Sequence, residues 1–493
     1  MFKPRRILVL ALAISVAALA NAAEFKPGEV IVKYRDDVVR TRSSMDLLYD
    51  SLNVKSVKHF SGMMTGFELL QLNDNVKVQD AISALQKDKA VEYAQPNYIL
   101  HALPIRYVQD QPSAPGGSVP CVPGMDIPGC DPNAPIPCLM PGVPFPPGCT
   151  DSGGGNSPAP APQPTNPPSQ PTQPPAARPA LMPAPAEVNP PVADPDLSKD
   201  YGLTKIGATD AWAITKGSKN FIVADIDTGI DYNHEDLAFN VWRNPHPSDK
   251  NDIVGYDFVH DDGLPFDDNE HGTHTAGTIG AVGGNGIGIS GVSQRVSLMA
   301  VKFLSGDGSG TTADAIRAID YAIGHGAKVL SNSWGGKSDG DNQALSDAID
   351  RARAKGVLFI AAAGNDGSDN DGNDPDYPAS FKQDNMIAVA ATDEQDTLAF
   401  FSNYGKTTTH LAAPGVNVYS TVPGNKYASL SGTSMACPHV AGAAALLWSM
   451  HPNWDYKKVK QVLLDTVDPI ASLKDKTVTG GRLNILRALR STE

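Results

Sequence analysis

The sequence is poor in aromatic residues and cysteine, and it has fewer basic than acidic residues. Aromatic side chains make up 7% of the 493 residues, five residues are cysteine, and 40 Lys and Arg stand against 54 Asp and Glu, giving a net charge of −14. The acidic balance argues against nucleic acid and anionic membranes as partners, because both require clustered Lys and Arg. Beyond the N-terminus, no apolar run is long enough to predict a membrane span.

Residues 1–22 have the pattern of a secretory signal peptide. Basic residues among the first six precede an apolar run over 7–14, which continues through small residues to Ala20-Asn21-Ala22. A basic start, a short apolar run and an A-x-A site predict cleavage and a secreted protein, either extracellular or periplasmic. The alternative is an N-terminal membrane anchor, for which the run is short.

The middle of the chain is rich in proline and holds four of the five cysteines. Residues 103–195 contain 28 of the 41 prolines, so backbone N–H donors are scarce and we expect a linker there. The cysteines form two similar units, Cys121 with Cys130 and Cys138 with Cys149. In an oxidising compartment, disulfide bonds within each unit are the simplest of three connectivities, and accidental spacing is the alternative.

Residues 23–102 have the pattern of a small α+β domain. Strands are expected at 29–34, 54–59, 66–72 and from 91 onward, and helices at 43–52 and 76–87. The order βαββαβ predicts a small antiparallel sheet with helices on one face. Because a domain of this size buries little surface, we expect it to be stabilised by a partner.

From residue 196 to 493, apolar runs of strand length alternate with helical segments. The runs lie at 220–226, 297–301, 328–332, 357–362 and 386–390, and helices are expected at 312–324 and 342–355. This alternation predicts an α/β domain, a mostly parallel sheet with helices on both faces. Functional residues in such folds gather at the carboxyl ends of the strands.

Three polar segments carry the groups needed for nucleophilic catalysis. Asp227 directly follows an apolar run, His271 begins the segment His-Gly-Thr-His-Thr-Ala-Gly, and Ser434 lies in Gly-Thr-Ser-Met-Ala-Cys-Pro-His. A serine hydroxyl is a weak nucleophile, so it needs a base such as imidazole, and the imidazole needs a carboxylate to fix its tautomer. Each residue alone is more typical of a turn, a cap or a structural position than of catalysis.

Together these segments resemble the subtilisin-like serine protease (subtilase) family over about residues 200–490. The resemblance implies Ser434 as nucleophile, His271 as general base and then general acid, and Asp227 as the carboxylate that orients it. It also implies that Asn365, in Ala-Ala-Ala-Gly-Asn, donates to the oxyanion together with the N–H of Ser434. Cys437, close to Ser434, is expected to be a small buried residue rather than a nucleophile.

The same resemblance implies where a substrate binds. An extended peptide would add as a strand between Gly308-Ser309-Gly310 and Ser333-Trp334-Gly335. The primary pocket would lie beside 361–365, with Asp366 near its rim and Asp376 near its base. Two carboxylates there would favour Lys or Arg before the scissile bond, and a solvated acidic loop or a calcium loop is the alternative.

Calcium, in a structural role, is the cofactor implied by the resemblance, since Ca²⁺ prefers carboxylate and carbonyl oxygens. The implied ligands, through side-chain or main-chain oxygens, are Asp236, Val282, Asn285, Ile287 and Ile289. A further carboxylate would come from Asp194 or Asp196. Asp257 and Asp262 are candidates for a second site, although His260 stands where relatives often have a carboxylate.

The segment Val91-Glu92-Tyr93-Ala94-Gln95-Pro96-Asn97-Tyr98 resembles the end of a subtilase propeptide. We therefore expect residues 23–102 to assist folding, to inhibit the enzyme and to be removed by self-cleavage. The chain departs from the family by inserting residues 103–195 before the catalytic domain (196–493), which leaves the cleavage site open. The expected partners are polypeptide substrates and the chain's own propeptide, without nucleic acid or, after signal removal, a membrane, and we expect a monomer.

Two function classes are compatible with these patterns. The first is an active secreted serine endopeptidase, made as a self-processing zymogen, and the second is a catalytically silent binding or adhesive protein on the same fold. The intact positions Asp227, His271, Asn365 and Ser434 favour the first. A related Ser-Glu-Asp acid peptidase is disfavoured because His271 lies in an intact His-Gly-Thr-His segment.

Overall fold

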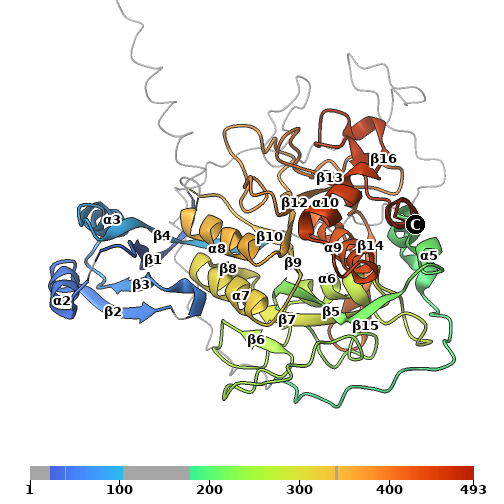
Figure 1. Cartoon of the computed structure of the whole chain (residues 1–493), viewed down its shortest axis with the longest axis horizontal. Coiled ribbons are helices and arrows are strands. Elements are labelled where there is room, and N and C mark those ends of the chain that lie inside the picture. Colours follow the sequence, from blue (N-terminus) through green and yellow to red (C-terminus); the bar gives the residue numbers. More distant parts are fainter. Residues whose placement is uncertain (1–22, 39, 61, 104–177, 339–341, 493) are drawn as a thin grey trace, which may run out of the picture. The chain divides into compact units, whose positions relative to one another are not determined.

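The computed structural model describes residues 23–38, 40–60, 62–103, 178–338 and 342–492. They belong to one compact unit, formed by an N-terminal segment (23–103) and a C-terminal segment (178–492) (Figure 1). The expected signal peptide and the four cysteines of the proline-rich stretch lie outside the described residues.

The N-terminal segment has the predicted βαββαβ order. Its elements are β1 (Phe25–Tyr34), α2 (Arg42–Ser51), β2 (Val54–His59), the 3-10 helix η1 (Gly62–Met64), β3 (Phe67–Leu72), α3 (Val78–Leu85) and β4 (Val91–Ala102). As predicted, the strands form an antiparallel sheet, and their order in it is β4-β1-β3-β2. Val30 and Val32 of β1 share a hydrophobic cluster with Ile82 of α3, whereas Ile31 belongs to a cluster with C-terminal residues. The C-terminal segment therefore covers apolar surface that this small sheet would otherwise expose.

The C-terminal segment is built on a nine-stranded sheet with the order β16-β17-β13-β12-β11-β9-β5-β7-β6. The strands are β5 (Gly217–Asp227), β6 (Gly255–Asp257), β7 (Arg295–Lys302), β9 (Val329–Asn332), β11 (Leu358–Ala362), β12 (Met386–Thr392), β13 (Leu411–Pro414), β16 (Asp468–Pro469) and β17 (Gly481–Arg482). Among the described strands of this sheet, every pairing except β16 with β17 is parallel. The predicted α/β fold with a mostly parallel sheet is confirmed.

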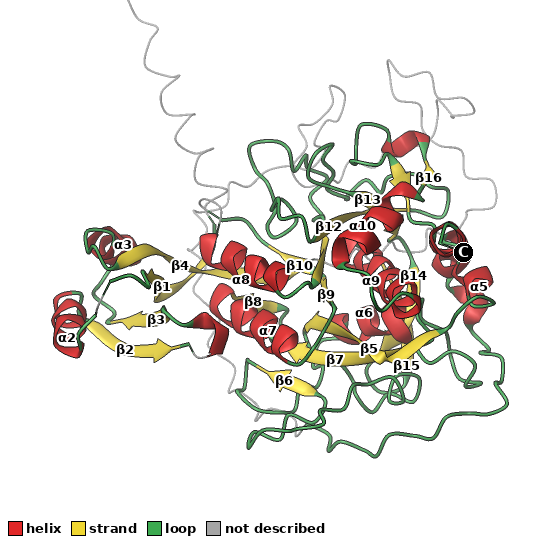
Figure 2. Ribbon diagram, in the orientation of Figure 1, coloured by secondary structure: helices red, strands yellow, loops and turns green. Residues whose placement is uncertain are grey.

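Helices cover both faces of this sheet. They are η2 (Leu197–Lys199), α4 (Tyr201–Lys205), α5 (Ala208–Ala211), α6 (His271–Gly280), α7 (Thr312–Gly324), α8 (Gln343–Ala354), α9 (Thr433–Met450), α10 (Tyr456–Asp465), η3 (Ala471–Leu473) and α11 (Ile485–Arg490). Successive residues of β5 enter two different clusters: Val223 lies with residues of α6 and α9, and Ala224 with residues of α7 and α8. Figures 1 and 2 show these two helix pairs on opposite sides of β5 and β9.

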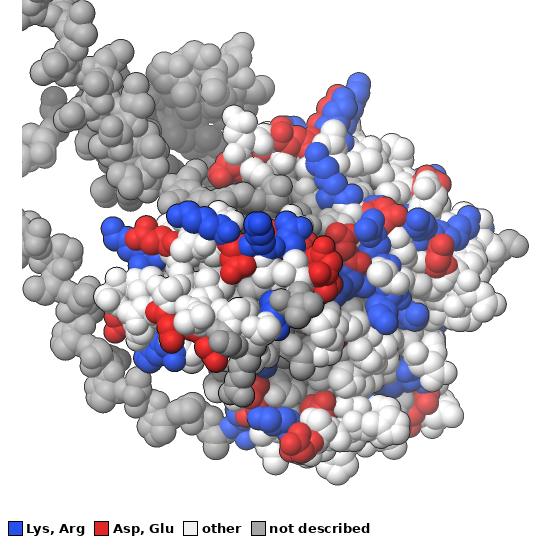
Figure 3. Space-filling view, turned by 60° about the vertical axis from the view of Figure 1, so that its left-hand side comes forward, with Lys and Arg blue, Asp and Glu red and all other residues white. Residues whose placement is uncertain are grey.

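Four short strands complete the described fold. β14 (Val418–Val422) and β15 (Lys426–Leu430) form a hairpin, while β8 (Ser309–Thr311) and β10 (Trp334–Gly335) pair with β4 of the N-terminal segment. Among the described helices, none is long and apolar enough to cross a membrane. Basic and acidic side chains are interspersed on the face shown in Figure 3, so the negative net charge forms no continuous patch there.

The end of the proline-rich stretch, residues 178–195, lies against loops from later in the C-terminal segment. The Tyr232 hydroxyl donates to the carbonyl of Pro179 at 2.7 Å, and the N–H of Val192 donates to the carbonyl of Gly284 at 2.8 Å. The sequence analysis assigned residues 178–195 to the linker, but their backbone groups are bound by loops of the C-terminal segment. Composition alone did not predict this packing, because a proline-rich sequence can pack when side chains of another segment supply its hydrogen bonds.

Candidate active site

Asp227 is the last residue of strand β5 and lies at the carboxyl edge of the large sheet. The neighbouring strands β7 and β9 fix β5 from both sides. Asp227 is fully buried, and its Oδ1 accepts the backbone N–H of Thr228 at 2.6 Å. Asp225, two residues earlier, is also buried, and burial followed by the charge of Asp227 raises the pKa of the Asp225 carboxyl well above its ordinary value.

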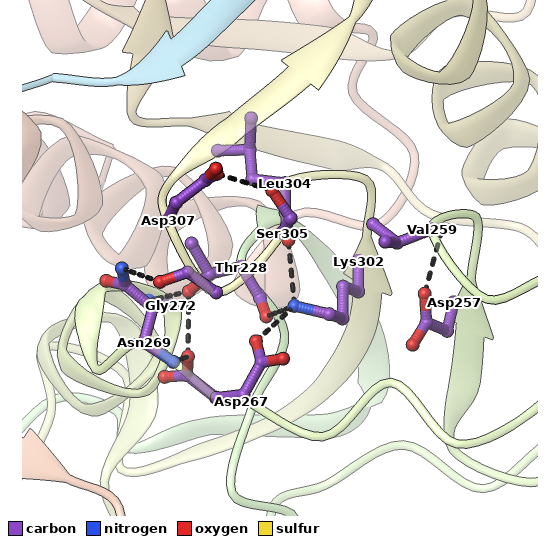
Figure 4. A network of polar contacts seen from close by, with 12 residues as sticks. Thr228, Asp257, Val259, Asp267, Asn269, Gly272, Lys302, Leu304, Ser305 and Asp307 are labelled. Carbon is purple, nitrogen blue, oxygen red and sulfur yellow. Dashed lines mark hydrogen bonds and ion pairs between the residues drawn. The ribbon is translucent and has the colours of Figure 1, made fainter. Parts of the chain in front are cut away.

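Asp267 fixes the start of α6, which carries His271. Its carboxylate accepts the N–H of Thr273 at 2.8 Å, within the first turn of the helix, and the hydroxyl of Thr228 at 2.9 Å. The first turn of a helix leaves its amide groups without partners inside the helix, so an acceptor there defines where the helix begins. Asp267 thereby ties the start of α6 to the residue that follows Asp227 (Figure 4).

Lys302, at the end of β7, supports the same edge. Its buried ammonium donates to the carbonyls of Thr228 at 2.6 Å and Leu304 at 2.8 Å, and to the carboxylate of Asp268 at 2.7 Å. Figure 4 shows Lys302 next to Thr228 and Leu304. The sequence analysis did not identify Lys302; the available signal was a lysine that directly follows the apolar run 297–301.

Asp227 and His271 form a hydrogen-bonded pair. Nδ1 of His271 lies 2.8 Å from Oδ1 of Asp227. Burial alone would lower the pKa of the imidazole, but the charge of Asp227 and its hydrogen bond raise that pKa above the ordinary value of 6.5. Among the described residues, Nε2 of His271 has no hydrogen-bond partner. With Nδ1 bound to a carboxylate, Nε2 is the nitrogen that can accept a proton.

Ser434 lies in the first turn of α9 and is fully buried. Its hydroxyl donates to the carbonyl of Ser333 at 3.1 Å, and the Ser333 hydroxyl donates to the carbonyl of Ser434 at 2.9 Å. Within the described residues, Ser434 and His271 are not hydrogen-bonded, although α6 and α9 pack against each other. Hydrogen bonds between a nucleophile and its base are often formed only when substrate is bound.

Asn365 is held next to Ser434 by Thr433. The N–H and the hydroxyl of Thr433 donate to Oδ1 of Asn365 at 2.9 and 2.8 Å. A Cβ atom placed on Gly432 would lie 3.1 Å from Nδ2 of Asn365 and 3.6 Å from the backbone N of Ser434. The two expected oxyanion donors therefore border the same small space, which a side chain at position 432 would fill.

The expected substrate edges already hold a peptide strand, the C-terminal part of β4. It pairs antiparallel with β8 on one side and with β10 on the other. The N–H of Ala102 donates to the carbonyl of Gly308 at 2.8 Å, and the N–H of Leu103 donates to the carbonyl of Ser333 at 3.4 Å. These are backbone contacts, so the two edges can bind an extended chain of varied sequence.

Two side chains of β4 also cap helices of the C-terminal segment. Oδ1 of Asn97 accepts the N–H of Ala313 in α7, and Oε1 of Gln95 accepts the N–H of Ala344 in α8, both at 2.9 Å. Helix caps are usually provided by a residue next to the helix in sequence. Sequence reasoning missed these two because the capping residues are more than 200 positions away.

Asp366 and Asp376 differ in exposure, and both lie near Lys337. The side chain of Asp366 is 54% exposed and that of Asp376 is 7% exposed. Nζ of Lys337 lies 3.8 Å from the carboxylate of Asp366 and 3.2 Å from that of Asp376. The expected preference for basic substrates assumed unpaired carboxylates, whereas these two share an ammonium of the chain itself.

The residues expected to bind calcium surround a buried carboxylate. Asp236 accepts the side-chain amide of Asn285 at 2.8 Å, the N–H of Ile289 at 2.9 Å and the Tyr427 hydroxyl at 3.1 Å. Burial raises the pKa of the Asp236 carboxyl to about 7, although these hydrogen bonds lower it and nearby Asp194 adds to the increase. No group of three or more His, Cys, Asp or Glu side chains is arranged for a metal in the described ranges.

The loop that would bind calcium fits a hard cation in part. A buried carboxylate that has no basic partner among the described residues and backbone carbonyls are suitable ligands. Asn285, however, presents its amide nitrogen to Asp236 and would have to present its oxygen instead. Of the two candidates for the remaining carboxylate, Asp194 accepts backbone N–H groups of this loop, at Gly284 and Asn285, whereas Asp196 pairs with Lys199.

The second acidic loop holds a guanidinium group. Nη1 of Arg178 lies 2.8 Å from Oδ2 of Asp257 and 3.0 Å from Oδ1 of Asp262, and it donates to the carbonyl of Leu264 at 2.9 Å. Nδ1 of His260 also contacts Asp257, at 2.8 Å. The oxygens considered for a second calcium ion are thus already bound by a cation of the chain. The sequence did not indicate this pairing, which joins positions far apart in the chain.

Comparisons with known proteins match the chain to two family profiles and to several proteases. The profile of the subtilase family matches residues 218–487, and that of the fervidolysin N-terminal prodomain matches residues 11–97. Thermitase of Thermoactinomyces vulgaris is 41% identical over 293 residues, which are 59% of this chain and 96% of thermitase. Subtilisin DY of Bacillus licheniformis is 42% identical over 266 residues, 54% of this chain and 90% of that protein. A thermophilic serine proteinase of Bacillus sp. (strain AK1) is 44% identical over 271 residues, 55% of this chain but only 62% of the relative.

Proposed function

The chain belongs to the subtilase family and is a serine endopeptidase with an N-terminal prodomain, and from this premise we propose that it cleaves polypeptides through Asp227, His271 and Ser434. The observation that carries the proposal is the buried 2.8 Å hydrogen bond between Asp227 and His271. A carboxylate in that position keeps the proton of a neutral imidazole on Nδ1 and stabilises the imidazolium that forms during reaction.

The proposed reaction begins with attack of Oγ of Ser434 on the carbonyl carbon of the scissile bond. Nε2 of His271 takes the hydroxyl proton, and the carbonyl oxygen becomes an oxyanion near Nδ2 of Asn365 and the N–H of Ser434. When the intermediate collapses, His271 returns the proton to the leaving amine and an acyl-enzyme remains on Ser434. A water molecule, activated by His271, then hydrolyses this ester.

The substrate is proposed to lie where β4 lies, as an added strand between β8 and β10. In support, the backbone contacts of Ala102 and Leu103 run along both edges and end at Ser333, which is hydrogen-bonded to Ser434. In the zymogen the prodomain would occupy these edges and keep the enzyme inactive. Self-cleavage within residues 103–177 would then allow it to leave.

The same proposal assigns the segments of the chain to a signal peptide, a prodomain, a linker and a catalytic domain. Residues 1–22 would direct secretion to the extracellular space or the periplasm, and residues 23–102 would be the prodomain. Residues 103–195 would form the linker, with pairing of Cys121 to Cys130 and of Cys138 to Cys149, followed by the catalytic domain at 196–493. The contacts of Pro179 and Val192 support keeping the last part of this linker on the mature enzyme.

Calcium is proposed as a structural ion. Asp236, with Asn285 and the carbonyls of Val282, Ile287 and Ile289, would hold it, together with Asp194. When bound, the ion would neutralise the buried carboxylate and stabilise the loop.

The test is hydrolysis of casein by the secreted protein and its Ser434→Ala variant. We expect hydrolysis by the wild type, none by the variant, and accumulation of unprocessed chain only in the variant. Intact mass and N-terminal sequencing of both samples report the cleavage site and the state of the four linker cysteines. Equal activity in both samples would contradict the proposal, and a folded wild-type protein without activity would favour a silent binding protein.

A further inference from the structure

Lys337 lies within an acidic cluster made by the loop 366–376. Its Nζ is 3.2 Å from a carboxylate oxygen of Asp376, 3.4 Å from one of Asp374 and 3.8 Å from one of Asp366. It also donates to the carbonyl of Asp374 at 2.8 Å. The side chain of Lys337 is 25% exposed and that of Asp376 only 7% exposed, so the closest of these ion pairs is partly shielded from water.

This cluster lies next to the proposed site of reaction. A Cβ atom on Gly364, the residue before Asn365, would lie 2.7 Å from Oδ2 of Asp376. From the other side, Gly336 and Tyr377 exchange backbone hydrogen bonds of 3.0 and 3.1 Å. These bonds bring the strand that would bind substrate, β10, alongside the loop that carries Asp376. Lys337 follows Gly336, so its short connection to β10 holds the ammonium at this position.

The chain itself shows what kind of side chain lies beside this strand. Leu103, whose N–H bonds to the carbonyl of Ser333, is buried, and a Cβ atom on Gly335 would lie 3.6 Å from its Cδ2. Leu103 belongs to the hydrophobic cluster that includes Ala362 and Ala436. An uncharged, apolar side chain therefore lies beside the backbone of β10, and the N–H of the same residue bonds to the Ser333 carbonyl that also accepts the Ser434 hydroxyl.

The charges decide which substrate side chains suit such a pocket. Carboxylates without a partner would attract the Lys or Arg side chain of a substrate. Burial raises the pKa of the Asp376 carboxyl to about 6, and the nearby ammonium of Lys337 works against that increase. A second ammonium would meet the charge of Lys337 or would have to displace it from three carboxylates, and like charges in a poorly solvated site repel strongly.

We propose that Lys337 is a specificity-determining residue: it occupies the acidic part of the primary pocket, so that the enzyme cleaves after apolar residues such as leucine rather than after lysine or arginine. The inference rests on the proposed function and adds the substrate class. It replaces the preference for basic residues that Asp366 and Asp376 alone would give.

The experiment compares kcat/KM for peptides that differ only in the residue before a chromogenic leaving group, with Leu, Lys or Arg in that position. We expect the wild type to prefer Leu over both basic residues. Lys337→Met keeps the aliphatic length but removes the charge, and we expect it to raise the ratio of Lys or Arg to Leu by at least about tenfold. Most of the change should appear in KM, because the pocket binds the side chain before and during reaction.

Three variants separate specificity from general damage. Lys337→Arg keeps a cation and should retain the wild-type preference, and Lys382→Met removes an exposed lysine elsewhere and should leave all three values unchanged. Adding Asp376→Asn to Lys337→Met should cancel the gain for basic residues. A purely structural role would lower kcat/KM for all peptides alike and leave the ratios constant.

Two results would overturn the inference without touching the proposed function: a wild type that cleaves after Lys or Arg as well as after Leu, or a Lys337→Met variant whose ratios stay within twofold of the wild type. The first needs no variant, so the inference can fail even if Lys337→Met does not fold. Failure of the proposed function would instead appear as a wild type that cleaves no peptide, or as cleavage that persists in Ser434→Ala.

Discussion

Nδ1 of His271 and Oδ1 of Asp227 lie 2.8 Å apart, and both side chains are shielded from water. The carboxylate is fixed by its place at the end of β5, and the imidazole by its place at the start of α6. Because neither group has to move to form the pair, the hydrogen bond is preorganised for a reaction in which the imidazole becomes charged.

This pair predicts the pH dependence of activity. His271 must be neutral to accept a proton, and Asp227 raises its pKa above 6.5, so kcat/KM should rise with pH through a pKa above 6.5. In Asp227→Asn the lowering effect of burial is opposed only by the charges of Asp267 and Glu270, so this acid limb should move to lower pH while kcat falls by about 10⁴. The measurement is a pH–rate profile with a chromogenic peptide. Asp249→Asn, an exposed site, is the control, and an unmoved limb in Asp227→Asn would contradict the assignment.

Asn365 should affect turnover more than binding. Replacing it by alanine removes one donor to the oxyanion, and we expect kcat to fall by about 10²–10³ with little change in KM. Asn365→Asp keeps an acceptor for Thr433 but offers no N–H, so it should lose kcat as well. Steady-state kinetics of both variants check this, and a loss confined to KM would show that Asn365 only positions substrate.

The helix caps that side chains of β4 provide should strengthen binding of the prodomain to the rest of the chain. Gln95→Ala combined with Asn97→Ala removes the acceptors for the N–H groups of Ala313 in α7 and Ala344 in α8, at a cost of about 1 kcal/mol for each cap. After the linker of the full-length Ser434→Ala protein is cut by an added protease, the dissociation constant of the prodomain should rise by about 30-fold. Gln79→Ala, on the exposed face of α3, is the control. An unchanged dissociation constant would show that the caps contribute nothing.

The buried carboxyl of Asp236 predicts how calcium dependence varies with pH. Without calcium its pKa is about 7, above the ordinary value of 3.8, so the folded chain holds a proton there that the unfolded chain has lost. Stability should therefore fall as pH rises from about 4 to 7. Calcium binds the charged form, so its effect on Tm should grow over the same range. Scanning calorimetry of the Ser434→Ala protein with calcium and with chelator checks this, and Asp236→Asn should lose both effects.

Arg178 should stabilise the catalytic domain. Arg178→Met removes the positive charge next to the fully buried Asp257, and we expect a loss of about 3 kcal/mol in the free energy of unfolding. Urea unfolding of the Ser434→Ala protein measures the loss, with the exposed Arg490→Met as control. Calcium should restore part of this stability, because the remaining ligands are carboxylate and carbonyl oxygens. Equal stability of the two variants would exclude a structural role for the pairing.

The fold and the central residues followed from the sequence because their signals are local. Apolar runs such as 357–362 mark buried strands, and Asp227 and His271 lie in segments typical of one family. The pairings of Lys337 with Asp376 and of Arg178 with Asp257 could not be predicted in the same way. Each pairing joins two loops that only the folded chain brings together. The local sequence, a lysine after glycine or an arginine before proline, does not indicate which residue the side chain pairs with.

The strand pairing between β4, β8 and β10 would make the proposed inhibition depend on the concentration of the prodomain. As long as the chain is continuous from Leu103 to Arg178, the strand that we propose to be inhibitory would compete at a local concentration on the order of millimolar, which dilution does not lower. After a single cleavage between these residues, the same contacts depend on the concentration of prodomain in solution. Release into a large volume would then activate the enzyme even if no individual contact became weaker.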